Sequence, residues 1–183
     1  MESVGPHRFL HEAELIHSKE DVQQAIANIA LQLNSDYANT CPIVLCVMGG
    51  ATVFTGLLLP QLTFLLEFDY VQATRYHGAT EGKNVEWVVK PKKLVNNRSV
   101  LILDDILDEG ITLKAIVDAC EQLGAKDVKI AVLAHKKLNK SKPIEANYVG
   151  LEVPNRYVFG CGMDINGWWR NLPDIYALRE TNH

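Results

Sequence analysis

The sequence predicts an α/β fold with a mostly parallel central sheet flanked by helices. Short apolar runs at 43–48, 98–103 and 128–134 have the composition of strands that are buried on both faces. Apolar residues at helical spacing lie between these runs, and the connecting turns are short. Strands that alternate with helices in this way are typical of a parallel sheet.

The first half of the chain contains two predicted helices, one on each side of the first predicted strand. Ser18 and Asp21 resemble a capping box that opens a helix, and apolar residues recur at helical spacing from there to Leu33. Two glycines end the apolar run at 43–48, and a second helix is expected at 52–59. This part of the chain therefore supplies one core strand and two helices.

The middle of the chain is expected to leave the sheet and return to it. A strand at 68–76 runs toward solvent, and the polar, glycine-containing stretch 77–84 is typical of a mobile loop. A strand at 85–89 then leads back. A helix is predicted at 112–123, where apolar residues share one face, and Gly124 supplies its stop.

Shorter strands are predicted toward the end of the chain. They lie at 148–151 and 157–159, and an edge strand is expected at 175–178. The 183 residues show no internal repeat, no low-complexity stretch and no linker. We therefore expect a single domain over 1–183.

Composition and charge narrow the class of protein. With 48% apolar residues and a net charge of −4, the chain is expected to be globular and to have no nucleic-acid partner. The first residues do not resemble a signal peptide, and the most apolar run, 57–68, is too short to span a bilayer, so no membrane partner is expected. Four cysteines without a C-x-x-C pair favour reduced thiols and a cytoplasmic location.

Candidate ligand-binding segments follow three of the predicted strands. In open α/β sheets, ligands bind outside the carboxyl ends of the strands. This rule brings together residues 48–50, 104–112 and 135–136, which directly follow or end the three core strands. We therefore expect the functional site at this edge of the sheet.

The segment after the second core strand contains four carboxylates within six residues. A solvated turn at a helix N-terminus would explain Asp108 and Glu109, because a helix N-terminus favours acidic residues. It explains Asp104 and Asp105 poorly, because they directly follow an apolar strand and buried carboxylates need partners. Such a pair suits a divalent metal ion or sugar hydroxyls.

The same segment also predicts an anion site. Gly110 and Thr112 lie where a glycine-containing turn leads into a helix, and the backbone N–H groups of such a turn bind anions. The acidic side chains nearby are expected to point away from a bound phosphate. The amides, rather than Asp108 or Glu109, would then hold it.

Residues 100–113 resemble the phosphoribosyl pyrophosphate (PRPP) signature of type I phosphoribosyltransferases, and most of all that of the hypoxanthine-guanine branch. The resemblance implies that Asp104 and Asp105 face the ribose hydroxyls and that Asp108 exchanges a proton with the purine's five-membered ring. It also implies that the 5′-phosphate lies in a cradle formed by Asp108, Glu109, Gly110, Ile111 and Thr112. Many members carry a hydroxyl residue where this chain has Glu109.

The family's pyrophosphate loop resembles Met48, Gly49 and Gly50. That loop often contains a non-proline cis peptide, which here would join Met48 to Gly49. Several relatives carry Lys or Arg where Gly49 stands, so the resemblance implies that backbone amides and a metal ion hold the pyrophosphate in this chain. Arg170, in a segment similar to the family's aromatic-then-arginine stretch, would contact the pyrophosphate as well.

The resemblance also identifies a purine site. Lys136 matches the lysine that donates to the exocyclic oxygen of a 6-oxopurine, and an ammonium donor favours an oxo group over an amino group. Tyr157 would stack on the purine ring, and Val158 would offer backbone groups to its edge. Three further lysines are interpreted as a solvated face: Lys137, Lys140 and Lys142.

A magnesium ion and a closing segment complete the implied site. Asp164 would bind Mg²⁺ on the base side, and Asp104 and Asp105 would do so beside the ribose. The fold that the resemblance implies includes a small hood subdomain. The segment at about 75–86, with Tyr76, corresponds to its flexible loop, which would exclude water from the reaction.

The resemblance implies purine salvage, in which the phosphoribosyl group of PRPP passes to hypoxanthine or guanine with Mg²⁺, giving IMP or GMP and pyrophosphate. It also implies a homodimer or homotetramer, to which the apolar run at 57–66 would contribute. Alternatives are an enzyme for xanthine, uracil or orotate and a PRPP-sensing regulator. The regulator should carry an extra domain or a basic face, and the net charge of −4 disfavours a basic face. A Rossmann-like nucleotide binder is disfavoured because no G-x-G-x-x-G follows a strand.

Overall fold

A computed structural model describes residues 5–75 and 85–179 of the chain. Its elements, in order, are α1 (His7–His11), β1 (Ala13–His17), α2 (Lys19–Asp36), β2 (Ile43–Val47), α3 (Ala51–Leu58), η1 (Leu59–Gln61), β3 (Glu67–Arg75), β4 (Val85–Val89), η2 (Lys93–Val95), β5 (Ser99–Leu107), α4 (Ile111–Gln122), β6 (Asp127–Lys136), β7 (Tyr148–Val153), β8 (Val158–Phe159) and β9 (Ile175–Leu178).

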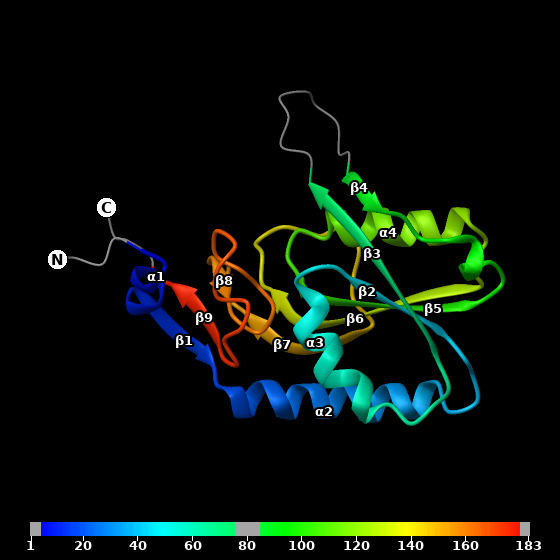
Figure 1. The fold of residues 1–183 in the computed structure, drawn as a ribbon, viewed down its shortest axis with the longest axis horizontal. Helices are drawn as coiled ribbons and strands as arrows, with labels where there is room; N and C mark the ends of the chain where they lie inside the picture. The colour runs from blue at the N-terminus through cyan, green and yellow to red at the C-terminus, as the bar shows by residue number, and fades with distance from the viewer. Residues whose placement is uncertain (1–4, 76–84, 180–183) are drawn as a thin grey trace.

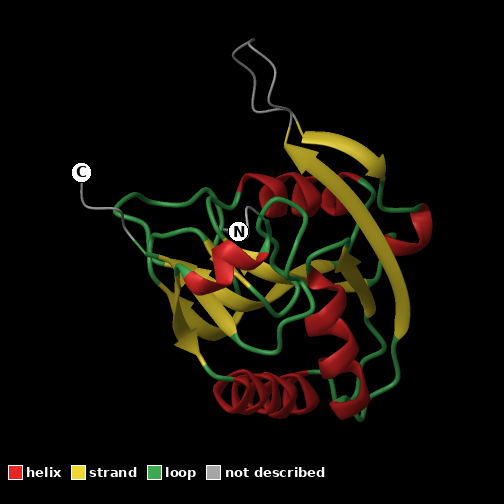
Figure 2. Cartoon of the chain, turned by 60° about the vertical axis from the view of Figure 1, so that its left-hand side comes forward, coloured by secondary structure: helices red, strands yellow, loops and turns green. Residues whose placement is uncertain are grey.

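The central sheet has six strands in the order β4-β3-β2-β5-β6-β7. All neighbours in it are parallel except β3 and β4, which pair antiparallel at one edge. Helices cover both faces of this sheet (Figures 1 and 2). The predicted α/β fold with a mostly parallel sheet is confirmed.

The core lies on both faces of the sheet, because successive residues of a strand point to opposite sides. In β5, Leu101 and Leu103 pack with α2 and α3, whereas Ile102 packs with α4. Every residue of β2 is buried, as its unbroken apolar composition predicts. The two central strands, β2 and β5, are therefore packed on both faces.

Helix α2 begins as its sequence predicts. The Ser18 hydroxyl accepts a hydrogen bond from the Asp21 backbone N–H at 3.2 Å, and the Asp21 carboxylate accepts one from the Ser18 N–H at 2.9 Å. These reciprocal bonds satisfy backbone groups that an uncapped helix would leave without partners. The capping box is confirmed.

Strand β5 continues further than predicted. It reaches Leu107 rather than residue 103, so Asp104 and Asp105 lie inside the strand and not in a loop after it. The physical reason is its neighbour β6, which pairs with β5 as far as Leu107 opposite His135. The backbone of the acidic pair is therefore held by the sheet.

A second, three-stranded antiparallel sheet has the order β1-β9-β8. Strand β9 lies in its centre, with Ala177 opposite both Glu14 and Val158, so the predicted edge position of 175–178 is wrong. The prediction did not include α1 and β1, because β1 acquires its partner only from the far end of the chain. Figure 1 shows this small sheet beside the carboxyl end of the large one.

The cysteines are all free: Cys41, Cys46, Cys120 and Cys161. In the described part of the chain, no helix has both the length and the apolar character needed to cross a membrane.

Candidate active site at the carboxyl edge of the sheet

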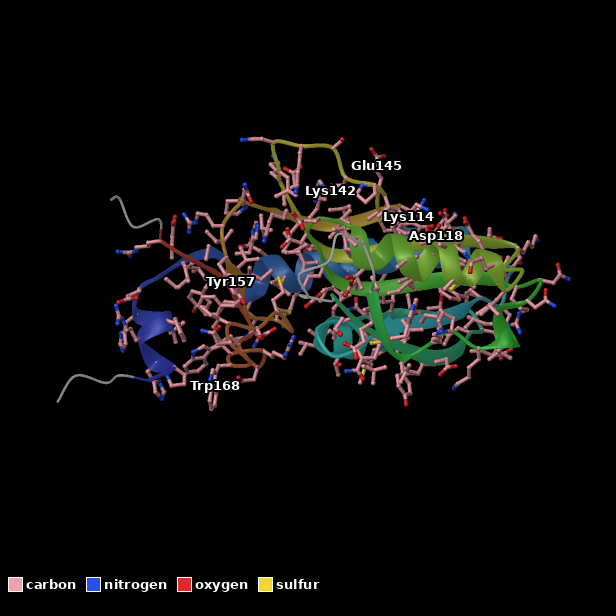
Figure 3. All side chains as sticks on the ribbon, turned by 90° about the horizontal axis from the view of Figure 1, so that it is seen from above. Lys114, Asp118, Lys142, Glu145, Tyr157 and Trp168 are labelled. Carbon is pink, nitrogen blue, oxygen red and sulfur yellow. The ribbon has the colours of Figure 1, made fainter. Side chains whose placement is uncertain are left out.

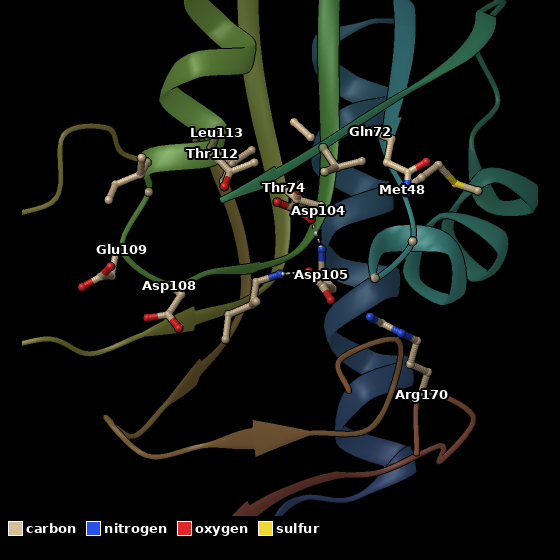
Figure 4. Close-up of a pocket in the computed structure, with 17 residues that line it drawn as sticks. Met48, Gln72, Thr74, Asp104, Asp105, Asp108, Glu109, Thr112, Leu113 and Arg170 are labelled. Atoms are coloured by element: carbon tan, nitrogen blue, oxygen red, sulfur yellow. Dashed lines mark hydrogen bonds between the residues drawn. The ribbon is translucent and has the colours of Figure 1, made fainter. Parts of the chain in front are cut away.

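A cavity of about 420 Å³ lies at the carboxyl ends of β2, β3 and β5 and the start of α4 (Figure 4). It brings together the segment after β2, the acidic end of β5 and the turn before α4. Predicted site residues that line it are Met48, Gly49, Gly50, Asp104, Asp105, Asp108, Glu109, Gly110, Ile111, Thr112 and Arg170.

Asp104 and Asp105 form the acidic floor of this cavity, which is called the larger cavity below. Only 8% of Asp104 and 9% of Asp105 is exposed, which is unusual for carboxylates. The Asp105 N–H donates to Asp104 Oδ1 at 2.9 Å, and the Ile106 N–H donates to Asp105 Oδ1 at 2.8 Å. These bonds fix both side chains toward the cavity.

Burial changes the acid–base properties of this pair. It raises the pKa of Asp104 well above its usual value, and the charge of Asp105 adds to that shift. Burial also raises the pKa of Asp105, although hydrogen bonding with Asp104 and Ile106 and the charge of Arg170 oppose the effect. Two buried carboxylates side by side suit a divalent cation that takes further oxygen ligands from a bound phosphate.

The segment after β2 approaches the acidic pair closely. The peptide bond between Met48 and Gly49 is cis, as the resemblance implies. A Cβ atom on Gly50 would lie 1.9 Å from Asp105 Oδ2, so only glycine fits there without displacing the carboxylate. The backbone of this segment thus forms one wall of the cavity.

The N-terminus of α4 forms the opposite wall. Gly110 adopts φ +80° as its N-cap, no side chain caps the helix and no acidic residue lies in its first turn. Free N–H groups at a helix N-terminus form an anion site. The arrangement can therefore bind a phosphate next to the acidic pair.

A smaller cavity of about 270 Å³ adjoins the first and shares Asp105, Ile106 and Asp108 with it. It also contains the predicted purine residues Lys136, Tyr157, Val158 and Asp164, and Met163 as well. The two cavities together bring into one place every predicted site residue within the described part of the chain. Tyr76 and most of the expected hood, 76–84, lie outside the described residues.

An ion pair crosses the smaller cavity. Lys136 Nζ lies 2.6 Å from Asp108 Oδ2, and the Lys136 side chain is only 12% exposed. Tyr157, by contrast, is half exposed, so the face of its ring is accessible. A buried cation, a carboxylate and an open aromatic ring are groups that recognise a polar heterocycle.

Arg170 lines the larger cavity and pairs with Asp164 of the smaller one. Its guanidinium donates to the Gly162 carbonyl at 2.6 Å and pairs with Asp164 Oδ1, also at 2.6 Å. In Figure 4, the Arg170 side chain points toward Asp105. Asp164 also accepts from the Gly167 N–H at 2.7 Å. Within the described residues, no three or more His, Cys, Asp or Glu side chains form a metal-binding group.

Sequence reasoning missed several lining residues. Gln72 and Thr74 of β3 lie in the larger cavity, and their alternation at the carboxyl end of a strand was a signal that could have identified them. The interpretation of Lys142 as part of a solvated face is wrong, because it is half-buried and donates to two backbone carbonyls. Lys137 and Lys140 are exposed, as expected.

Comparison with known proteins assigns this fold and site to a family. A family model described as phosphoribosyl transferase domain matches residues 12–166. The chain therefore belongs to the phosphoribosyltransferase family. Within that family it lies in the hypoxanthine-guanine branch, as its relatives show.

One such relative is the hypoxanthine-guanine phosphoribosyltransferase of Bacillus subtilis, which is 32% identical over 173 residues, 93% of this chain and 96% of that protein. The bifunctional protein TilS/HprT of Listeria innocua is 33% identical over 97% of this chain, which spans 28% of that protein's length. A crystal structure of a Staphylococcus aureus hypoxanthine phosphoribosyltransferase has a TM-score of 0.85 at 28% identity, with 97% of each chain covered. This chain therefore has the fold of that crystal structure.

Proposed function

We propose that the protein transfers the 5-phosphoribosyl group of PRPP to hypoxanthine or guanine, giving IMP or GMP and pyrophosphate, as a step of purine salvage. The observation that carries the proposal is the junction of the two cavities at Asp105 and Asp108. One cavity offers an acidic pair beside a helix N-terminus, and the other offers an ammonium beside an aromatic ring. Ribose, phosphate and purine can therefore be bound next to one another.

In this proposal, the sugar phosphate occupies the larger cavity. The carboxylates of Asp104 and Asp105 accept hydrogen bonds from the ribose hydroxyls. Backbone N–H groups from Gly110 to Thr112 hold the 5′-phosphate. The amides of 48–50 and the guanidinium of Arg170 hold the pyrophosphate. Support comes from the buried pair, the uncapped α4 and the position of Arg170 in the lining of this cavity.

The purine occupies the smaller cavity. Lys136 donates to its 6-oxo group, Tyr157 stacks on its ring and Val158 offers backbone groups to its edge. Asp108 accepts or shares the proton that the attacking ring nitrogen loses. As the glycosidic bond to pyrophosphate breaks, positive charge develops on the ribose, and the nearby carboxylates stabilise it.

Mg²⁺ is the proposed cofactor. Asp104 and Asp105 would hold an ion beside the ribose and Asp164 one on the base side, and the buried, paired acids at the cavity floor support the first assignment. When bound, the ion neutralises charge on the departing pyrophosphate.

The assembly and location are proposed as well. Exposed Leu57 and Leu65 support the expectation that the 57–66 surface joins copies into a homodimer or homotetramer. The free cysteines support a cytoplasmic location. Light scattering after size-exclusion chromatography measures the assembly, and a monomer at micromolar concentration would contradict this part of the proposal.

The central experiment is a turnover assay. The protein is mixed with PRPP and Mg²⁺ and with hypoxanthine, guanine, xanthine, adenine, uracil or orotate in turn, and pyrophosphate release is followed. Release with hypoxanthine or guanine is expected, and little release with adenine. The proposed function is wrong if none of the 6-oxopurines is converted. Xanthine as the best substrate would identify the xanthine-preferring alternative instead.

A further inference from the structure

Lys142 makes contacts that a solvated lysine does not make. Its Nζ donates to the Leu107 carbonyl at 2.7 Å and to the Lys136 carbonyl at 2.6 Å. The side chain is half-buried, and burial lowers the pKa of its ammonium. Figure 3 shows Lys142 on the segment that links β6 to β7. The ammonium therefore joins two backbone positions that belong to different strands.

Those two carbonyls adjoin the groups that face the base. Leu107 is the last residue of β5 and directly precedes Asp108, whereas Lys136 is the last residue of β6. The last residue pair between these strands is Leu107 opposite His135, so the ladder between them ends there. Beyond it, the Lys136–Asp108 ion pair at 2.6 Å and the Lys142 ammonium hold the strand ends together.

The residues after Lys142 contact the phosphate-binding turn. A Cβ atom built on Gly110 would lie 3.2 Å from Ile144 Cγ2 and 3.5 Å from Pro143 Cδ. The same short segment thus underlies the start of α4 through apolar packing and the ends of β5 and β6 through the ammonium. The segment therefore makes two contributions that can be separated by mutation. The packing against Gly110 needs no charge, whereas the contacts with the Leu107 and Lys136 carbonyls need a hydrogen-bond donor.

We propose that Lys142 is a positioning residue for the purine. Its ammonium holds the Leu107 and Lys136 carbonyls at a fixed separation, so that the Asp108 carboxylate and the Lys136 ammonium both face the base cavity. The neighbouring lysines do not share this role. Lys137 pairs with Glu152 at 2.5 Å and Lys140 with Glu109 at 2.5 Å, and both lysines are mostly exposed.

The test is Lys142→Met, which removes the donor and keeps an unbranched apolar stem. Since the packing on Gly110 is retained, binding of PRPP should change little. The KM for hypoxanthine should rise roughly tenfold or more, because small misplacements of binding groups weaken productive binding strongly. The KM for PRPP should change by less than about twofold. The matched control is Lys137→Met, for which both constants should stay at wild-type values.

Equal increases in both KM values, or no increase in either, would overturn the positioning role. The inference rests on the proposed function, so a second readout does not depend on turnover. Hydrogen–deuterium exchange of the free protein should be faster over residues 106–108 in Lys142→Met than in the wild type or Lys137→Met. Unchanged exchange in that stretch overturns the inference even if the wild type proves inactive, whereas inactivity with faster exchange contradicts only the proposed function.

Discussion

Asp108 lies one residue beyond β5, where its carboxylate meets the buried ammonium of Lys136 at 2.6 Å. At the scale of single residues, this pair joins the acidic segment to the base cavity. Its two members come from different strands, so each holds the other's orientation. Removal of one charge would leave the other without a partner in a partly buried place, which is costly.

The first prediction concerns the proton carried by Asp108. Asp108→Asn keeps the shape of the side chain and removes the proton acceptor, so kcat should fall by about 100-fold or more. Stabilisation of the protein by PRPP and Mg²⁺, measured as a Tm shift, should change little. Asp118→Asn is the control, because Asp118 pairs with Lys114 on the exposed side of α4. Equal losses of kcat and of the PRPP-dependent shift would contradict the role.

The second prediction concerns the close approach at Gly50. Gly50→Ala places a methyl group within 1.9 Å of Asp105 Oδ2 and must displace that carboxylate. We expect affinity for PRPP, measured by calorimetry, to fall about tenfold, and stability to fall by about 1–3 kcal/mol. Gly56→Ala is the control, because a Cβ at this exposed position of α3 meets nothing within 4 Å. That variant should gain about 0.5–1 kcal/mol and keep its affinity.

At the scale of elements, α2 makes hydrogen bonds that stabilise it at both ends. Its start carries the capping box of Ser18 and Asp21. Its last residue, Asp36, accepts a hydrogen bond from the Tyr148 hydroxyl of β7 at 2.5 Å and lies 3.4 Å from Lys129 Nζ of β6. These contacts align α2 along the sheet face that it covers. We therefore expect their removal to lower the free energy of unfolding.

The cap at the start of α2 leads to the third prediction. Ser18→Ala removes the side-chain acceptor for the Asp21 N–H and should lower the free energy of unfolding by about 1 kcal/mol. Urea denaturation measures this change. Ser35→Ala, in the exposed last turn of the same helix, should change stability far less. Comparable effects of the two substitutions would show that the cap contributes nothing of its own.

The fourth prediction concerns pH. The hydrogen bond from Tyr148 is the main reason why the pKa of Asp36 is lowered, and the contact with Lys129 adds to it. A lowered pKa in the folded state gives stability that is present above the unfolded pKa of about 3.9 and is lost as pH falls through the folded value. Tyr148→Phe should therefore destabilise the protein at neutral pH.

The stability difference between wild type and Tyr148→Phe should narrow as pH falls below about 4, because Asp36 becomes protonated in both proteins. Urea denaturation between about pH 7 and pH 3 follows this difference. Tyr70→Phe, at an exposed ring on β3, should give a difference that does not vary with pH over this range. A constant difference for Tyr148→Phe as well would exclude the Asp36 contact as its cause.

At the scale of the whole molecule, the candidate site spans two sheets. Asp105 belongs to β5 of the large sheet, whereas Arg170 lies in the connection between β8 and β9 of the small one. A ligand that contacts both would hold the two sheets together. Binding to the folded state alone raises its stability by mass action.

The fifth prediction follows from that arrangement. PRPP with Mg²⁺ at about 100 times its Kd should stabilise the protein by about 2.7 kcal/mol, seen as a rise in Tm. EDTA should abolish most of the rise, because the buried acidic floor then repels the pyrophosphate. Arg170→Met should reduce the rise even with Mg²⁺ present. A rise that is the same with EDTA would contradict the proposed magnesium requirement.

The large sheet and most of its helices could be predicted from the sequence. Apolar runs such as 43–48 and the capping box at Ser18 are local patterns, and their consequences are local as well. The location of the candidate site could be predicted for the same reason. The segments after β2, β5 and β6 follow the carboxyl ends of parallel strands, where ligands bind in such sheets. Asp104, Asp105 and Lys136 could be identified as site residues from their local sequence, without knowledge of distant contacts.

Other features depended on partners far away in the chain. Strand β1 has little pattern of its own and becomes a strand because β9 pairs with it. The sequence predicts that β5 ends at residue 103, whereas pairing with β6 extends the strand to Leu107, beyond its apolar run. The sequence predicts that Lys142 is a solvated surface lysine. Only the fold brings the Leu107 and Lys136 carbonyls to its ammonium.

By itself, the sequence determined the α/β class, the large sheet and the segments that line the site, because periodicity and strand-end chemistry are properties of neighbouring residues. The tertiary structure alone decided the central place of β9, the strand position of Asp104 and Asp105, and the contacts of Lys142. Each of these is a contact between segments distant in sequence. Such contacts form only when the whole core offsets the entropy of closing the chain.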